Sequence, residues 1–279
     1  GRHEEQREAI AARVEAMGSV LSRGHTLVEY GAGNGELALT LMLRAQAQVA
    51  REAAAGDRDA ELGSVVLVDS AKSPAKNADG KLRALVRGST PAQRPAPPPR
   101  TVGGGQTHRA RIGLEDLDLC ELAQQVAPGR RTVLVAKHLC GVATDYALRS
   151  AVASKAAGSP PVAVAISTCC HHRCSYQAYP NRPFLARLGL SGRADFAMLC
   201  RAASWCIDGR QTGDDAAATT RARVGASAKA LLDEGRAEYM RTHGFDDTTL
   251  CRFVDAAVSP ENMLLVARAA PVRNDRSEK

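Results

Sequence analysis

A short apolar run followed by a helix-forming stretch recurs five times along this chain, before two strand-type runs close it. The strand-type runs cover residues 26–30, 64–69, 110–112, 132–136, 162–167, 250–254 and 263–267. Helix-forming stretches between them cover residues 36–55, 76–87, 115–126, 144–155 and 221–243. Strands that alternate with helices pair in parallel through crossover connections. The order therefore predicts an α/β fold with a mostly parallel seven-stranded sheet and one antiparallel edge strand.

One long interruption separates the second strand-type run from the third. Residues 91–99 are rich in proline and residues 103–105 are three glycines, a composition that does not pack into a regular element. We therefore expect an N-terminal helix at 1–22, one domain at 23–270 with a flexible insertion at 70–108, and a tail at 271–279. From residue 70 to 111, nine Lys or Arg residues face the single acid Asp79. The insertion is either a solvated loop or an arm that faces RNA.

Charge and hydropathy exclude some classes of protein. A formal charge of +7 and an isoelectric point near 9.1 suit an anionic partner such as nucleic acid. A membrane-spanning segment is not expected, since the sequence contains no apolar run of eighteen residues. The charged start lacks the apolar core of a signal peptide, so we expect a cytoplasmic or nuclear setting in which the eight cysteines stay reduced.

A glycine-rich loop follows the first strand-type run. Glu29 is the second-last residue of that run, and the sequence Gly-Ala-Gly-Asn-Gly that follows Tyr30 leads directly into a helical stretch. Glycines permit a sharp turn and a close approach of the backbone to a ligand. A dinucleotide fingerprint would need another glycine at position 36, where this chain has Glu36. Asp69 closes the second strand-type run, where a carboxylate can accept hydrogen bonds from ribose hydroxyls.

The conjunction of an acid, three glycines and a second strand-ending acid resembles class I methyltransferases, which have a Rossmann-like α/β fold. The resemblance implies S-adenosyl-L-methionine as cofactor and S-adenosyl-L-homocysteine as product. The implied cofactor contacts at these two strand ends are Glu29, Gly31, Gly33, Asn34, Gly35 and Asp69. In that superfamily a residue after the third strand contacts the adenine, which points to Asp116 and the backbone of Leu117.

Two clusters of histidine and cysteine follow the fourth and fifth strand-type runs. The first contains Lys137, His138 and Cys140, and the second runs from Cys169 to Cys174. Functional groups of open α/β sheets gather at the carboxyl ends of the strands. Because neighbouring strands lie about 5 Å apart, we expect both clusters to reach one cavity.

The clusters allow two interpretations. A zinc site is disfavoured because structural zinc takes ligand pairs separated by two to four residues, whereas adjacent Cys169 and Cys170, and His171 and His172, cannot all face one ion from an extended chain. We therefore predict no metal ligand. The favoured interpretation is a catalytic and substrate-positioning site, with Cys169 as a small buried side chain beside the cofactor.

These clusters also carry a specific resemblance. Residues 137–145 (KHLCGVATD) and 169–174 (CCHHRC) closely resemble the eukaryotic tRNA 2′-O-methyltransferase family that modifies nucleotide four of the acceptor stem. Residues 81–83 and 231–239 are similar to further segments of that family, and the likeness covers about residues 20–268. The resemblance implies methyl transfer from S-adenosyl-L-methionine to a ribose 2′-hydroxyl of tRNA. Two features depart from the family: small zinc-binding modules before the domain are not present here, and Ser70 stands where a basic residue is usual.

The implied reaction assigns roles to the strand-end side chains. A ribose hydroxyl must be aligned with the methyl group and must lose a proton. We expect Lys137 or His138 to orient or deprotonate the hydroxyl, and His171, His172 and Arg173 to hold the ribose and its phosphate. The expected RNA contacts are Lys76, Lys81, Arg83, Arg173 and Arg236.

Three other functions remain open at this point. The chain is alternatively a methyltransferase that acts on ribosomal RNA or protein, or a non-catalytic RNA-binding module with the same fold. A nicotinamide-dependent dehydrogenase is disfavoured by Glu36.

Overall fold

The computed structural model describes residues 1–72, 77–88, 105–206 and 216–269. The strands are β1 (Thr26–Tyr30), β2 (Val65–Asp69), β3 (Thr107–Arg111), β4 (Thr132–Cys140), β5 (Ala163–Cys169), β6 (Asp247–Arg252) and β7 (Met263–Arg268). The helices are α1 (Arg2–Glu15), α2 (Glu36–Ala54), α3 (Asp79–Val86), α4 (Leu119–Val126), α5 (Val142–Ala156), α6 (Arg182–Arg187), α7 (Arg193–Ser204) and α8 (Ala216–Thr242), with a 3₁₀ turn η1 (His171–Arg173).

The seven strands form one sheet in the order β3-β2-β1-β4-β5-β7-β6. The first five strands of this order pair in parallel, and β7 is antiparallel to both β5 and β6. The predicted α/β class and the mostly parallel sheet are confirmed. The single reversed strand is β7, which lies one place inside the edge, so its predicted position at the edge is wrong. Residues 253–262 join β6 to β7 as an antiparallel pair, and β7 also pairs with β5, which leaves β6 at the edge.

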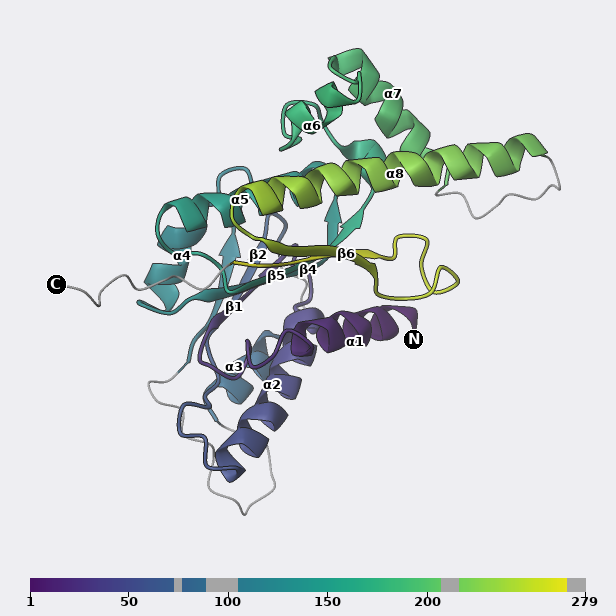
Figure 1. The fold of residues 1–279 in the computed structure, drawn as a ribbon. Coiled ribbons are helices and arrows are strands. Elements are labelled where there is room, and N and C mark those ends of the chain that lie inside the picture. The colour runs from purple at the N-terminus through teal and green to yellow at the C-terminus, as the bar shows by residue number, and fades with distance from the viewer. Residues whose placement is uncertain (73–76, 89–104, 207–215, 270–279) are drawn as a thin grey trace.

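Helices cover both faces of the sheet (Figure 1). One apolar core joins α1, α2 and α3 to one face, and a second joins α4, α5 and α8 to the other. Strands β1, β2, β5 and the first part of β4 read as largely apolar runs because both of their faces are buried. Ile10, Ala11 and Val14 of α1 are fully buried in the first core, so the N-terminal helix is part of the domain's packing.

Several element boundaries differ from the sequence-based expectation. The first helix ends at Glu15 because the chain turns at Gly18, where φ is +90°. Helices α6 and α7 lie between β5 and α8, where no regular element was predicted. They pack on a third, small apolar cluster that includes Tyr179, Phe196 and Leu232. Within the expected flexible insertion at 70–108, α3 and the start of β3 are regular, and its proline-rich part lies outside the described residues.

The strand order changes direction between β1 and β4. The crossover from β1 leads to β2 on one side, and β4 lies on the other. Ligands of open α/β sheets bind outside the carboxyl ends of the strands at such a switch point.

Among the described residues, no helix has the length and apolar character needed to cross a bilayer.

Candidate active site

A cavity of about 270 Å³ opens at the carboxyl ends of β1 and β4. Its walls come from the loop after β1, the end of β4, and the first two turns of α1. The lining residues are His3, Arg7, Glu29, Gly31, Ala32, Gly33, Asn34, Glu36, Leu37, Lys137 and His138. The structure therefore brings together the glycine loop and the Lys137–His138 pair, whereas the second cluster, residues 169–174, was also expected at this cavity and contributes none of the lining residues.

The glycine loop has the backbone geometry that only glycine adopts without strain. Gly31, Gly33 and Gly35 all have positive φ, between +46° and +75°. A Cβ atom on Gly31 would lie 3.1 Å from the carbonyl oxygen of His138, so this glycine also permits β4 to approach the loop closely. The Gly33 backbone N–H donates a hydrogen bond of 2.8 Å to Oδ2 of Asp69. Asp69 thus fixes the loop from the end of β2.

Glu29 lies beneath the loop with its side chain almost fully buried. Its Oε2 accepts a 2.9 Å hydrogen bond from the backbone N–H of Ala38 in the first turn of α2. Burial raises the pKa of this carboxyl to about 8, although that hydrogen bond and the positive charges of Arg109 and Lys137 oppose the shift. A buried carboxyl in this state is suited to a cationic ligand group, which would favour its ionised form.

Lys137 and His138 occupy an irregularity in β4. The pairing of β4 with β5 shifts register between Ala136 and Leu139, so these two residues lie outside the regular ladder and line the cavity. Lys137 is half-buried, and burial followed by the charge of Arg7 lowers the pKa of its ammonium group. Partial desolvation and then Lys137 lower the pKa of His138 to about 4.

Helix α1 forms a wall of the cavity that the sequence did not reveal. The Nδ1 atom of His3 lies 3.4 Å from Nζ of Lys137, and the His3 ring packs edge-on against His138 with 5.9 Å between centroids. Arg7 also lines the cavity, and its buried Nε has no hydrogen-bond partner among the described residues. The periodicity of α1 predicts its apolar face but carries no signal of where its polar end docks.

Arg109 also has a role that the sequence does not reveal, since there it is only one of the nine basic residues between 70 and 111. Its guanidinium forms a two-point ion pair with Asp79 of α3, at 2.6 and 3.0 Å, and donates a 3.0 Å hydrogen bond to the carbonyl oxygen of Gly33. Arg109 therefore links β3, α3 and the glycine loop.

The histidine cluster after β5 divides between interior and surface. His171 is fully buried, and its Nε2 lies 2.8 Å from Oδ1 of Asp233. His171 was predicted to contact the substrate, but in this structure no part of its ring reaches solvent. His172 and Arg173 are exposed on η1 and remain available to a substrate.

Arg236 likewise does not reach the surface. Its guanidinium is fully buried and pairs with Asp145 of α5 at 2.8 Å and with Asp233 at 3.0 Å. Arg236 was predicted to contact RNA, but in this structure its side chain is completely covered and its guanidinium is held by two carboxylates. Burial would raise the pKa of Asp233, but His171 and Arg236 hold that pKa below its usual value.

The other predicted contacts are dispersed. Asp116 is exposed and Leu117 packs on the second apolar core, and neither lines the cavity. Lys81 and Arg83 are exposed on α3, whereas Lys76 lies outside the described residues. The adenine and RNA contacts of these residues stay predictions.

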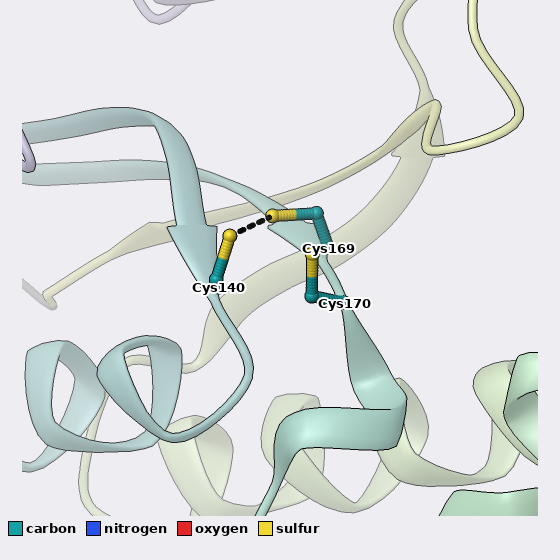
Figure 2. Close-up of side chains that lie close together, drawn as sticks. All are labelled: Cys140, Cys169 and Cys170. Atoms are coloured by element: carbon teal, nitrogen blue, oxygen red, sulfur yellow. Dashed lines mark hydrogen bonds between the residues drawn. The ribbon is translucent and has the colours of Figure 1, made fainter.

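Cys169 does not line the cavity, and its sulfur lies 3.9 Å from that of Cys140 (Figure 2). Cys170 joins them, so that the three sulfur atoms lie within 4.8 Å of one another. In an extended chain, adjacent Cys169 and Cys170 could not both face one ion. The chain is not extended at Cys170, which adopts a left-handed conformation with φ of +50°. Burial raises the pKa of the Cys169 thiol well above its usual value.

Residues 5–268 of this chain match the protein family described as "Methyltransferase TRM13". The chain belongs to the TRM13 methyltransferase family. The match covers all seven strands, so the sheet and cavity described above are the TRM13 domain of this chain.

Curated relatives agree with this assignment. The "tRNA:m(4)X modification enzyme TRM13" of Eremothecium gossypii is 32% identical over 257 residues, which is 86% of this chain and 56% of the relative. The enzyme of the same name from Yarrowia lipolytica is 28% identical, over 95% of this chain and 59% of the relative. The human "TRM13 homolog" is 24% identical, over 95% and 64%. This TRM13 family chain thus spans less than two thirds of the length of each of these relatives.

Proposed function

We propose that this chain is the catalytic domain of a tRNA methyltransferase with a Rossmann-like class I fold, acting in the cytoplasm or nucleus. It would transfer a methyl group from S-adenosyl-L-methionine to the ribose 2′-hydroxyl of nucleotide four in the acceptor stem. The observation that carries the proposal is the cavity in which the glycine loop and Glu29 face Lys137 and His138. The names of the relatives support tRNA as the substrate.

The residues around the cavity fit the methyl donor. Its methionine moiety carries an ammonium group and a carboxylate, and its sulfonium is positively charged. Glu29 supplies a buried carboxyl toward the cationic groups, while Arg7 supplies a guanidinium whose buried Nε lacks a partner among the described residues. Asp69 would accept a hydrogen bond from the donor's ribose, since its carboxylate has more acceptor sites than the two backbone N–H groups that it already binds.

The chemistry requires alignment and the removal of one proton. When bound, the donor supplies a methyl group that is already activated by the adjacent positive sulfur. Transfer of this methyl group would require the ribose oxygen to lie in line with the carbon–sulfur bond that breaks, which releases S-adenosyl-L-homocysteine, and a nearby base to take the hydroxyl proton. Lys137 and His138 both line the cavity, and either one takes the proton or orients the hydroxyl.

Exposed cations would position the RNA around this cavity. His172 and Arg173 on η1 would hold the ribose and phosphate, and Lys81 and Arg83 on α3 would contact the RNA backbone. Such contacts supply affinity and orientation, and duplex RNA is read mainly through its shape. Selection of nucleotide four is consistent with measurement from the end of a helix.

Incubation with labelled S-adenosyl-L-methionine and a tRNA transcript tests the proposed reaction. We expect one 2′-O-methyl mark at nucleotide four, and no label in a matched transcript that carries a 2′-deoxyribose at that nucleotide. Label at another nucleotide, in ribosomal RNA or in protein would contradict the proposed substrate. Binding of tRNA without transfer, in the presence of bound donor, would favour a non-catalytic RNA-binding module.

Variants of the two candidate bases test the mechanism. Lys137→Met and His138→Gln keep much of each side chain's volume but remove its basic group. We expect at least one of them to lower single-turnover methyl transfer by about a hundredfold or more, the range of general-base catalysis. Donor affinity, measured by calorimetry, should change much less. Near-full turnover in both variants would contradict a role for either residue.

A further inference from the structure

The three cysteines at the ends of β4 and β5 form a compact cluster of sulfur atoms. Cys140 ends β4, Cys169 ends β5, and Cys170 is the next residue. Figure 2 shows the three side chains turned toward one another, with the sulfur atoms between the two strand ends. The remaining described cysteines do not join this cluster. The cluster therefore lies where two adjacent strands, β4 and β5, end.

We propose that Cys140, Cys169 and Cys170 bind one zinc ion through their three sulfur atoms, with the fourth coordination position open to solvent. This site is independent of the proposed methyl transfer.

The distances fit a tetrahedral thiolate site. Zinc–sulfur bonds of about 2.3 Å at tetrahedral angles place neighbouring sulfurs about 3.8 Å apart. The Cys140 and Cys169 sulfurs lie 3.9 Å apart, and all three lie within 4.8 Å. The largest adjustment needed on binding is therefore about 1 Å, which side-chain rotation can supply.

The backbone at Cys170 is what makes the third ligand available. In a continued strand, Cys169 and Cys170 would point to opposite faces of the sheet. Cys170 instead has a φ of +50°, and it is the only non-glycine among the described residues with a positive φ. A strained conformation of this kind persists where surrounding structure or function compensates for it. Binding of a metal ion by the redirected thiol is such a compensation.

Exposure supports an open fourth position. Cys169 is buried, whereas Cys140 and Cys170 are half-buried. One side of the cluster therefore faces solvent, and three protein ligands with a free position are a known arrangement for zinc. We place no fourth protein ligand, because the metal-ligating groups that come within reach of all three sulfurs in the described chain are the cysteines themselves.

Metal content and cobalt spectroscopy test the site. Chain purified under reducing conditions should contain one zinc per molecule, and Co²⁺ added to metal-free chain should give thiolate-to-cobalt charge-transfer absorption. Cys140→Ser, Cys169→Ser and Cys170→Ser should each weaken zinc binding more than tenfold. Cys120→Ser on α4 is the matched control and should leave binding unchanged.

Three outcomes would overturn the proposal. The first is that folded, reduced chain contains no metal and shows no charge-transfer absorption with cobalt. The second is zinc binding that survives all three serine changes. The third is a disulfide between Cys140 and Cys169 as the native state of the cluster. If the serine variants fail to fold, alkylation of the wild-type chain decides. Zinc should slow modification of these three cysteines but not of Cys120, and equal rates with and without zinc would refute the site.

Discussion

At the scale of single residues, the site is built from groups whose ordinary preferences are overridden by their surroundings. Glu29 is an acid held in the apolar interior, and its pKa rises to about 8 as a result. Gly31 occupies a left-handed conformation against the backbone of β4. Burial of the Glu29 carboxyl is unfavourable for folding alone, which is typical of positions that serve a ligand, whereas the conformation of Gly31 is one that glycine adopts without strain.

Glu29→Gln tests the role of the buried carboxyl. The pKa of Glu29 is raised above its unfolded value near 4.5, so the native state holds the extra proton between about pH 4.5 and 8. Its contribution to the free energy of unfolding is therefore present at low pH and is lost as the pH rises through this window. Urea denaturation should show that the free energy of unfolding falls less between pH 5 and pH 8 in Glu29→Gln than in the wild type. Donor binding should weaken roughly tenfold to a hundredfold, the effect of losing one charged hydrogen bond. An unchanged donor affinity would contradict a contact with the donor.

Gly31→Ala tests the close approach of loop and strand. The new Cβ would meet the His138 carbonyl oxygen at 3.1 Å in a conformation with φ of +60°. We expect a loss of about 1–2 kcal/mol in the free energy of unfolding from the conformation alone, together with weaker donor binding. Gly80→Ala in α3 is the control, since its Cβ meets nothing within 4 Å and its φ is not positive. Equal stability and affinity in both variants would show that the approach is unimportant.

At the scale of elements, two contacts organise the domain around the cavity. Helix α8 is joined to α5 and to the segment after β5 by the buried group of Asp145, His171, Asp233 and Arg236. Helix α1 closes one side of the cavity with polar side chains from its first two turns. One contact supports the fold and the other supports the ligand site, so their disruption should have separable effects.

Arg236→Ala tests the buried ion-pair group. Removal of the guanidinium would leave the carboxylates of Asp145 and Asp233 buried without their cation, which costs about 3–5 kcal/mol in the free energy of unfolding. Arg223→Ala on the exposed face of the same helix should cost less than about 0.5 kcal/mol. Thermal and urea unfolding measure both variants. Loss of tRNA affinity at unchanged stability in Arg236→Ala would instead indicate an RNA contact.

Arg7→Leu tests the contribution of α1 to donor binding. Arg7 lines the cavity, and its buried Nε has no hydrogen-bond partner among the described residues. A donor carboxylate would therefore gain a charged hydrogen bond there. We expect roughly tenfold to a hundredfold weaker binding of S-adenosyl-L-homocysteine by calorimetry. Arg13→Leu, on the exposed face of the same helix, should bind as the wild type does. Equal affinity of the two variants would remove Arg7 from the site.

At the scale of the whole molecule, the sheet was predictable because its central strands β1, β2, β4 and β5 contain apolar runs between helices. The glycine loop, Glu29 and the Lys137–His138 pair were predictable for the same reason, since they follow strand ends in the sequence. The docking of α1, the interior position of Arg236 and the position of β7 depend on contacts between distant segments, which local patterns do not record. The convergence of Cys169 and Cys170 was missed because it depends on one left-handed residue.

The overall shape also offers a competing position for a ligand. A hollow of about 530 Å³ lies at the opposite, amino ends of the strands, bordered by residues that include His25, Arg131 and Asp247. It is larger than the cavity beside the glycine loop but contains neither the loop nor the residues at the carboxyl ends of β1 and β4. Ligands of open α/β sheets bind at the carboxyl ends, so we assign the donor to the smaller cavity.

A crystal structure of the chain with S-adenosyl-L-homocysteine tests this assignment most directly. The account predicts that the ligand lies on the glycine loop, with its amino acid moiety near Glu29 and Arg7 and its sulfur facing Lys137 and His138. Ligand density in the hollow beside His25 and Arg131, or a ligand sulfur turned away from the end of β4, would contradict it.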